Sequence, residues 1–194
     1  MHDCLTYLIR VVEVLRPVTL PIFPVRSEEP VVVLTDASFK TSTMTGELGV
    51  VAWCPRLRKL YYSSAKMPRW MILLFLWIQT KLTYICQAEL VAALCFYLTF
   101  PELARGRLVH HFVDNDAAKS GLIKGTSASP NSSRILLHVQ MILLQCDPWF
   151  GFVYSEDNIS DLPSRGDFTL MESLGAEFRT MVFPQLRGYF RDDI

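Results

Sequence analysis

The sequence lacks the features that mark several classes of protein. Its five cysteines show no CxxC spacing and several stand inside apolar runs, so we expect reduced thiols rather than disulfides or a zinc site. The neighbouring His110 and His111 would alternate across a strand, so they cannot both face one metal ion. Charge of either sign is not in excess, because 19 basic residues balance 19 acidic ones. This balance argues against a tight, non-specific binder of nucleic acid.

Long hydrophobic runs are also missing. The most membrane-like run, residues 71–78, is far shorter than the roughly 18 residues that a spanning helix needs, and Arg69 and Lys81 flank it. We expect no membrane span; a buried core segment or a hydrophobic insertion is favoured, with a peripheral interaction surface as the alternative. The N-terminus is amphipathic rather than an apolar core with a cleavage site, so we expect no secretory signal and an intracellular protein, cytoplasmic or nuclear.

What is present indicates one domain with a substantial core. The chain has 194 residues, of which 51% are hydrophobic and 20% charged. Polar side chains spaced three and four apart predict an amphipathic helix over residues 3–16, which Pro17 ends. A linker punctuated by prolines follows. We therefore divide the chain into an N-terminal helix and linker (1–30), a domain (31–168), and a C-terminal helix and tail (169–194).

The hydrophobic patterns of the domain predict alternating strands and helices. Strands are expected over residues 31–38, 48–55, 59–64, 107–115 and 149–155, and helices over 86–100, 116–125, 132–146 and 167–175. The second and third strands are close enough for an antiparallel hairpin, and residues 67–83 could be helix or strand. A hairpin followed by strands that alternate with helices indicates an α/β fold, with a five-stranded mixed sheet and helices on both faces.

Four carboxylates occupy distinctive places in this pattern. Asp36 lies near the end of the first strand, Glu89 lies in the first turn of a helix, Asp114 lies near the end of the fourth strand, and Asp161 opens a short helix or turn. Two of the strands can bring their acids together if they are neighbours. Magnesium prefers oxygen ligands, and two divalent ions about 3.5–4 Å apart can activate water and neutralise charge on a phosphodiester. The pattern therefore favours a two-metal site.

The acids and their surroundings resemble the ribonuclease H domain of retrotransposon reverse transcriptases. The resemblance covers roughly residues 31–168 and rests on VVVLTDAS, QAELVAAL, VDNDAA with LIKG, and NISDLPSR. It implies a ribonuclease H-like fold and a metal-dependent endonuclease that cuts the RNA strand of RNA–DNA hybrids. By the resemblance, Asp36, Glu89, Asp114 and Asp161 bind two Mg²⁺ ions, with Mn²⁺ as the alternative. The N-terminal helix and linker would be the remnant of a connection to a polymerase domain, which would be a partner.

The same resemblance suggests a set of residues that contact the substrate. They are Ser38, Asn115, Asn158, Ser164 and Arg165.

The sequence departs from the family pattern in three places. The separation of Asp36 and Glu89 is longer than expected, and the excess is the apolar stretch 67–80. The loop 155–160 contains no histidine to assist product release, so Glu156 could substitute. No basic protrusion for gripping the hybrid follows Asp114. Two alternatives therefore stay open: a catalytically silent or domesticated retroelement fragment that acts as a binding module, and a related nuclease with another nucleic-acid substrate.

Overall fold

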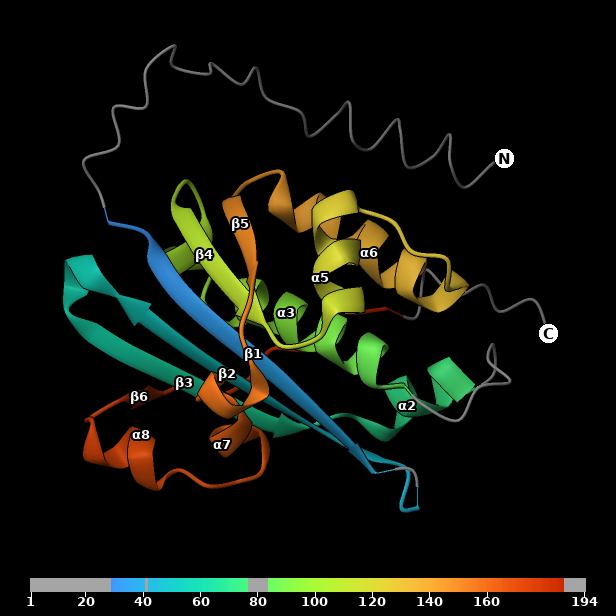
Figure 1. The fold of residues 1–194 in the computed structure, drawn as a ribbon, viewed down its shortest axis with the longest axis horizontal. Coiled ribbons are helices and arrows are strands. Elements are labelled where there is room, and N and C mark those ends of the chain that lie inside the picture. Colours follow the sequence, from blue (N-terminus) through green and yellow to red (C-terminus); the bar gives the residue numbers. More distant parts are fainter. Residues whose placement is uncertain (1–28, 41, 77–83, 187–194) are drawn as a thin grey trace, which may run out of the picture.

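One mixed sheet flanked by helices organises the molecule (Figure 1). The computed structural model describes residues 29–40, 42–76 and 84–186, so the helix predicted over residues 3–16 and its linker lie outside the description. The strands are β1 (Val31–Lys40), β2 (Thr45–Cys54), β3 (Lys59–Lys66), β4 (Leu108–Val113), β5 (Asp147–Phe152) and β6 (Glu177–Phe178). The helices are α2 (Arg69–Leu76), α3 (Ile85–Thr99), α4 (Pro101–Ala104), α5 (Asp116–Lys124), α6 (Pro130–Leu143), α7 (Asp161–Ser164) and α8 (Thr169–Ser173).

The sheet has six strands in the order β5-β4-β1-β2-β3-β6, so the expectation of five was wrong. The additional strand, β6, has two residues and pairs with β3 in parallel. Two residues are too few to show an alternating pattern, which is why the sequence did not reveal it. The expected antiparallel hairpin of β2 and β3 is confirmed, with Arg58 in the left-handed conformation between the strands.

Helices lie on both faces of the sheet, as expected, but they cover the two faces unequally. Helix α3 packs on β1 and β2 and contacts α5 and α6, which complete this layer (Figure 1). Almost every residue of α3 is buried, which explains why its sequence is apolar around most of its circumference. On the opposite face, α7 contacts β1, β2 and β3, and Met171 of α8 packs against Val51 and Tyr62.

The stretch that the sequence left undecided is helical over its described part. Helix α2 spans Arg69–Leu76, and its Met71 and Ile72 are buried in the main core, while residues 77–83 lie outside the description. Met71 and Ile72 of the apolar run are therefore core residues, whereas Leu73 is exposed. Among the described helices, none is both long and apolar enough to cross a membrane.

Candidate metal centre

Asp36 and Asp114 are brought together by the pairing of two parallel strands. Residues Val31 to Thr35 of β1 pair in register with Val109 to Val113 of β4, so the next residue on each strand is an aspartate. Asp36 lies four residues before the end of β1, because β1 continues beside β2 as far as Lys40. Asp114 follows the last residue of β4. The two carboxylates thus meet at the point where the pairing of β1 with β4 ends.

Glu89 reaches the same point from the helical layer. It lies in the second turn of α3 rather than the first, because the helix begins at Ile85. The backbone N–H of Ala37 donates a hydrogen bond to Glu89 Oε1 over 3.2 Å, which fixes the carboxylate against β1. The other oxygen, Oε2, is buried and has no hydrogen-bond partner among the described residues. A buried carboxylate oxygen without a partner is costly unless a cation satisfies it.

The three acids form a compact cluster. Asp36, Glu89 and Asp114 each offer a carboxylate oxygen, and these oxygens all lie within 4.8 Å of one another. Asp36 and Glu89 are almost fully buried, whereas Asp114 is partly exposed. Oxygen ligands from three separate elements at this spacing suit a hard divalent cation, and the cluster could hold a metal ion.

The electrostatics of the cluster also favour a bound cation. Burial raises the pKa of Asp36 to about 6, and the charges of Asp114 and Asp161 add to the effect. Burial also raises the pKa of Glu89 well above its usual range, again reinforced by the charges of Asp36 and Asp114. Without a cation, therefore, the fold holds these carboxyls where their charged forms are unfavourable. A bound cation reverses that penalty, because it stabilises the charged forms.

Asp161 approaches this cluster but is not one of its three members. It begins α7, as the sequence predicted, and it lies near enough to Asp36 to raise the pKa of that carboxyl. Its own carboxylate accepts a hydrogen bond of 2.7 Å from Nε of Arg165, with which it forms a partly exposed ion pair. The structure therefore brings three of the four predicted acids together and places the fourth at their margin.

A glycine lets α7 approach the sheet closely enough for this arrangement. Gly49 of β2 lies opposite Asp36, and a Cβ atom there would come within 2.3 Å of the Ser160 carbonyl oxygen and 2.7 Å of the Ser164 backbone nitrogen. No side chain larger than hydrogen fits at this contact without movement of the backbone. Gly49 therefore determines how near α7 and Asp161 lie to Asp36.

Two serines hold the aspartates in position. Ser164 is buried at the end of α7, and its hydroxyl donates a short hydrogen bond to Oδ2 of Asp36. Ser155 donates to Oδ2 of Asp114 over 3.1 Å. Sequence reasoning placed Ser164 among the substrate contacts and gave Ser155 no role. Nothing local in the sequence indicates either bond, because each joins residues that are far apart along the chain.

The other predicted substrate contacts divide into buried and accessible residues. Asn158 is buried. Its side chain donates a hydrogen bond to the Thr35 carbonyl and accepts one from Ser160, so it links β1 to the segment before α7. Asn115 caps α5 through a hydrogen bond from the Ala118 N–H. Ser38 is partly exposed on β1 and Arg165 is exposed.

The loop before Asp161 offers one accessible acid. Glu156, which we considered as a substitute for the missing histidine, is exposed in the turn Ser155–Asp157.

The two adjacent histidines point to opposite faces of β4, as the sequence predicted. His111 is buried between Thr35 and Tyr97, with hydrogen-bond distances of 2.9 and 3.1 Å, and burial lowers its pKa to about 3. His110 lies on the other face, beside Trp149. They therefore do not share a metal site.

Comparison with solved structures identifies the fold. No family model and no curated protein matches the sequence. Ribonuclease H1 of the halophilic archaeon Halobacterium salinarum NRC-1 superposes with a TM-score of 0.56 at 14% identity, over 74% of this chain and 99% of that one. LC11-RNase H1, isolated from compost by a metagenomic approach, superposes with a TM-score of 0.54 at 17% identity, over 73% and 98%.

The same compost protein in complex with an RNA/DNA hybrid gives a TM-score of 0.54 at 16% identity, over 73% of this chain and 99% of that one. The chain therefore has the ribonuclease H-like fold, which the sequence had led us to expect.

Proposed function

We propose that this chain is a metal-dependent ribonuclease H that hydrolyses the RNA strand of RNA–DNA hybrids. The convergence of Asp36, Glu89 and Asp114 at one end of β1, on a ribonuclease H-like fold, is the observation that carries this assignment. Asp161 is the fourth acid of the proposed site, on the strength of its position at the start of α7 and its effect on Asp36. The proposed cofactor is Mg²⁺, as two ions, with Mn²⁺ as the alternative.

The residues present fit such a cofactor. The unpartnered Oε2 of Glu89 and the buried Oδ atoms of Asp36 are the groups that a hard cation would satisfy, and Asp114 and Asp161 stand at the solvent side. Divalent ions held there would lower the pKa of bound water and neutralise charge on the phosphodiester in the transition state.

The protein's own contribution is to fix these ligands in advance. The Ala37 N–H holds Glu89, Ser164 holds Asp36, and Ser155 holds Asp114. Each carboxylate therefore has one oxygen that is already oriented by a donor and another that is available. Fixed ligands lose little freedom when a cation or a substrate phosphate binds, and this preorganisation favours catalysis.

Ser38, Asn115 and Arg165 are the proposed substrate contacts that remain accessible to a ligand. Arg165 carries the positive charge that a phosphate needs, although Asp161 holds its Nε. Support for a hybrid substrate comes from the compost ribonuclease H1, whose structure was solved with an RNA/DNA hybrid.

We extend the same proposal to the origin of the chain. Its segments VDNDAA and NISDLPSR resemble the ribonuclease H domain of retrotransposon reverse transcriptases, so a polymerase domain is the proposed partner and the cell interior the proposed location.

Cleavage of a labelled RNA–DNA hybrid, with Mg²⁺ or Mn²⁺, tests the proposed activity. The purified chain should cut the RNA strand, Asp114→Asn should abolish cutting, and Asp116→Asn should not. Asp116 is a matched control because it lies two residues away in an exposed ion pair with Lys119. Cutting of single strands or junctions instead of hybrids would indicate a related nuclease. No cutting of any substrate by the folded chain would favour the silent binding module.

A further inference from the structure

Part of one sheet face carries no helix in the described part of the chain. Helix α7 lies over the end of the sheet that holds Asp36, and Met171 of α8 covers Val51 and Tyr62 on β2 and β3. The helices α3, α5 and α6 form the layer on the opposite face (Figure 1). Strands β1, β4 and β5 are thus left without a helix on the α7 side, toward the ends of the strands farthest from the acids.

The uncovered residues form a continuous apolar surface across four strands. Strand register aligns Trp53 with Val32, Val32 with His110, and His110 with Trp149, and it aligns Leu34 with Phe112 in the next row. Directly opposed residues share a face, so these side chains lie together. We call the surface formed by these residues the open sheet face; its members are Val32, Leu34, Trp53, His110, Phe112 and Trp149.

The side chains of the open sheet face are exposed to solvent and also packed against one another. Trp53 is 39% exposed and Trp149 is 53% exposed. The Trp149 ring lies 5.3 Å from the ring of His110 and 5.7 Å from that of Phe112. A Cβ atom at Gly151 would come within 2.7 Å of both Phe112 and Trp149, so glycine is what allows the indole to lie across β4. Contiguous exposed apolar surfaces of this kind usually mark an interaction site.

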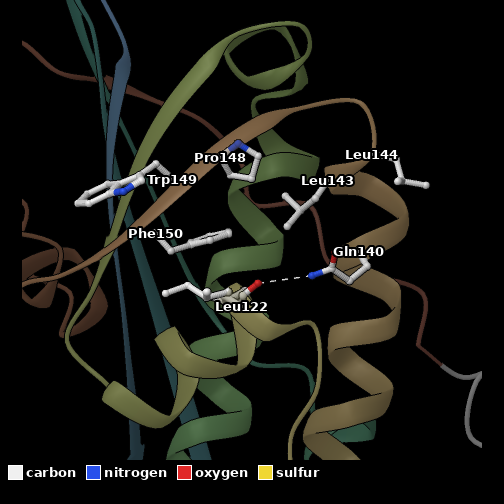
Figure 2. A pocket seen from close by; sticks show the side chains of 8 residues that line it. Leu122, Gln140, Leu143, Leu144, Pro148, Trp149 and Phe150 are labelled. Atoms are coloured by element: carbon white, nitrogen blue, oxygen red, sulfur yellow. Dashed lines mark hydrogen bonds between the residues drawn. The ribbon is translucent and has the colours of Figure 1, made fainter. Parts of the chain in front are cut away.

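The open sheet face borders a cavity on the helical side of β5 at one residue, Trp149, which lines that cavity. That cavity, of about 410 Å³, lies between α5, α6 and β5. Figure 2 shows Phe150 pointing toward Leu122 and Leu143, while Trp149 points away across the strand. The other members of the open sheet face do not line the cavity, so a ligand there would leave them uncovered.

The chain contains one outlying segment that is attached in the right place to cover this face. Residues 77–83 lead into Tyr84 and residues 187–194 follow Leu186, and both of these residues belong to the main core. Residues 1–28 instead precede β1, one of the two central strands of the open sheet face, and so enter beside Val32.

The composition and length of that segment also match the surface. Its sequence predicts an amphipathic helix over residues 3–16, with an apolar stripe of Leu5, Leu8, Ile9, Val12 and Leu15. Such a helix would be about 21 Å long, and four adjacent strands span about 14 Å between the first and the last. The linker 17–30 could extend over about 45 Å, so reach is not limiting.

We propose that residues 3–16 form a helix that packs on the open sheet face of their own chain. The apolar stripe would cover Trp53 and Trp149, and the polar side chains of the helix would face solvent. The fold would then have helices over the whole of both sheet faces. This assignment does not depend on the proposed nuclease activity, because none of the residues involved belongs to the acid cluster.

Hydrogen exchange of the full chain, followed by mass spectrometry, tests this packing. Amides of residues 3–16 should exchange at least tenfold more slowly than in an unstructured peptide, since an isolated helix of this length is only marginally stable. The double variant Trp53→Ser/Trp149→Ser should remove that protection. The control, Ile123→Ser/Leu174→Ser, changes two large apolar residues that are more exposed than the tryptophans but lie off the open sheet face, and it should retain protection.

A second measurement tests the same packing with substitutions in residues 3–16. Iodide should quench tryptophan fluorescence more strongly in Leu8→Asp than in the wild type, whereas Thr6→Asp, on the polar side of the predicted helix, should leave quenching unchanged. Three results would overturn the assignment: no protection of residues 3–16, protection that survives the double tryptophan variant, or a dimer in sedimentation that this variant abolishes. The last result would mean that a second copy covers the face.

Discussion

Replacing Asp36 by asparagine should stabilise the metal-free protein at neutral and alkaline pH. The pKa of Asp36 is about 6 in the folded protein against 3.8 for an unperturbed aspartate, and burial is the main cause. The folded state therefore prefers the protonated carboxyl, and the free energy of unfolding falls as the pH rises from about 4 to about 6. Asparagine has no charge to bury, and its Oδ1 can still accept the hydrogen bond from Ser164.

The size of the effect follows from the two pKa values. A difference of about two pH units corresponds to about 3 kcal/mol, which is the most that Asp36→Asn can gain at pH 8. Well below pH 4, the Asp36 carboxyl is protonated in both the folded and the unfolded protein, so the variant and the wild type should be equally stable. Saturating Mg²⁺ should remove the advantage at pH 8, because the ion would stabilise the wild type and bind the variant weakly.

Urea unfolding at pH 4, 6 and 8, in a chelator and in Mg²⁺, measures these differences directly. The exposed Asp116→Asn serves as the control and should change the free energy of unfolding by less than about 1 kcal/mol at every pH. A variant that is no more stable than the wild type at pH 8 in chelator would refute the view that Asp36 is held in an electrostatically unfavourable position.

Three further predictions concern the surroundings of the acids. Ser164→Ala removes a buried donor to Asp36, so it should cost about 1–3 kcal/mol of stability in urea unfolding and weaken Mg²⁺ binding in calorimetry. Gly49→Ala should cost at least about 1–3 kcal/mol and lower Mg²⁺ affinity, since its Cβ would collide with the Ser160 carbonyl; wild-type stability would contradict the close contact. The pKa of His111, about 3 when folded against 6.5 when unperturbed, means that wild-type stability falls as the pH drops from about 6.5 toward 3. His111→Gln should flatten that slope, and an unchanged slope would assign it to other groups.

The sequence was sufficient for the parts of the fold that follow from hydrophobic pattern. The β-branched run at the start of β1 and the apolar helix α3 were both located because burial leaves a strong signature. The extent of helix cover was not predictable: Val32 and Leu34 are only partly buried, so β1 is not covered on both faces along its whole length by described residues. Pattern alone could not distinguish a covered face from an open one.

The site was predictable in its residue types but not in its geometry. Asp36, Glu89 and Asp114 could be selected because each stands near the end of a strand or helix in a suggestive segment. Their meeting depends on the register of β1 and β4, which the sequence does not specify locally. The position of Asp161 depends on the contact of α7 with Gly49, a tertiary contact that no periodicity encodes.

Binding of Mn²⁺, counted by electron paramagnetic resonance, tests most directly whether the acids form a metal centre. We predict that the wild type binds Mn²⁺ at submillimolar concentration, that Asp114→Asn and Glu89→Gln lose this binding while remaining folded, and that Asp116→Asn retains it. Absence of binding to the wild type at millimolar Mn²⁺, or equal binding by the wild type and Asp114→Asn, would contradict the assignment of Asp36, Glu89 and Asp114 as metal ligands.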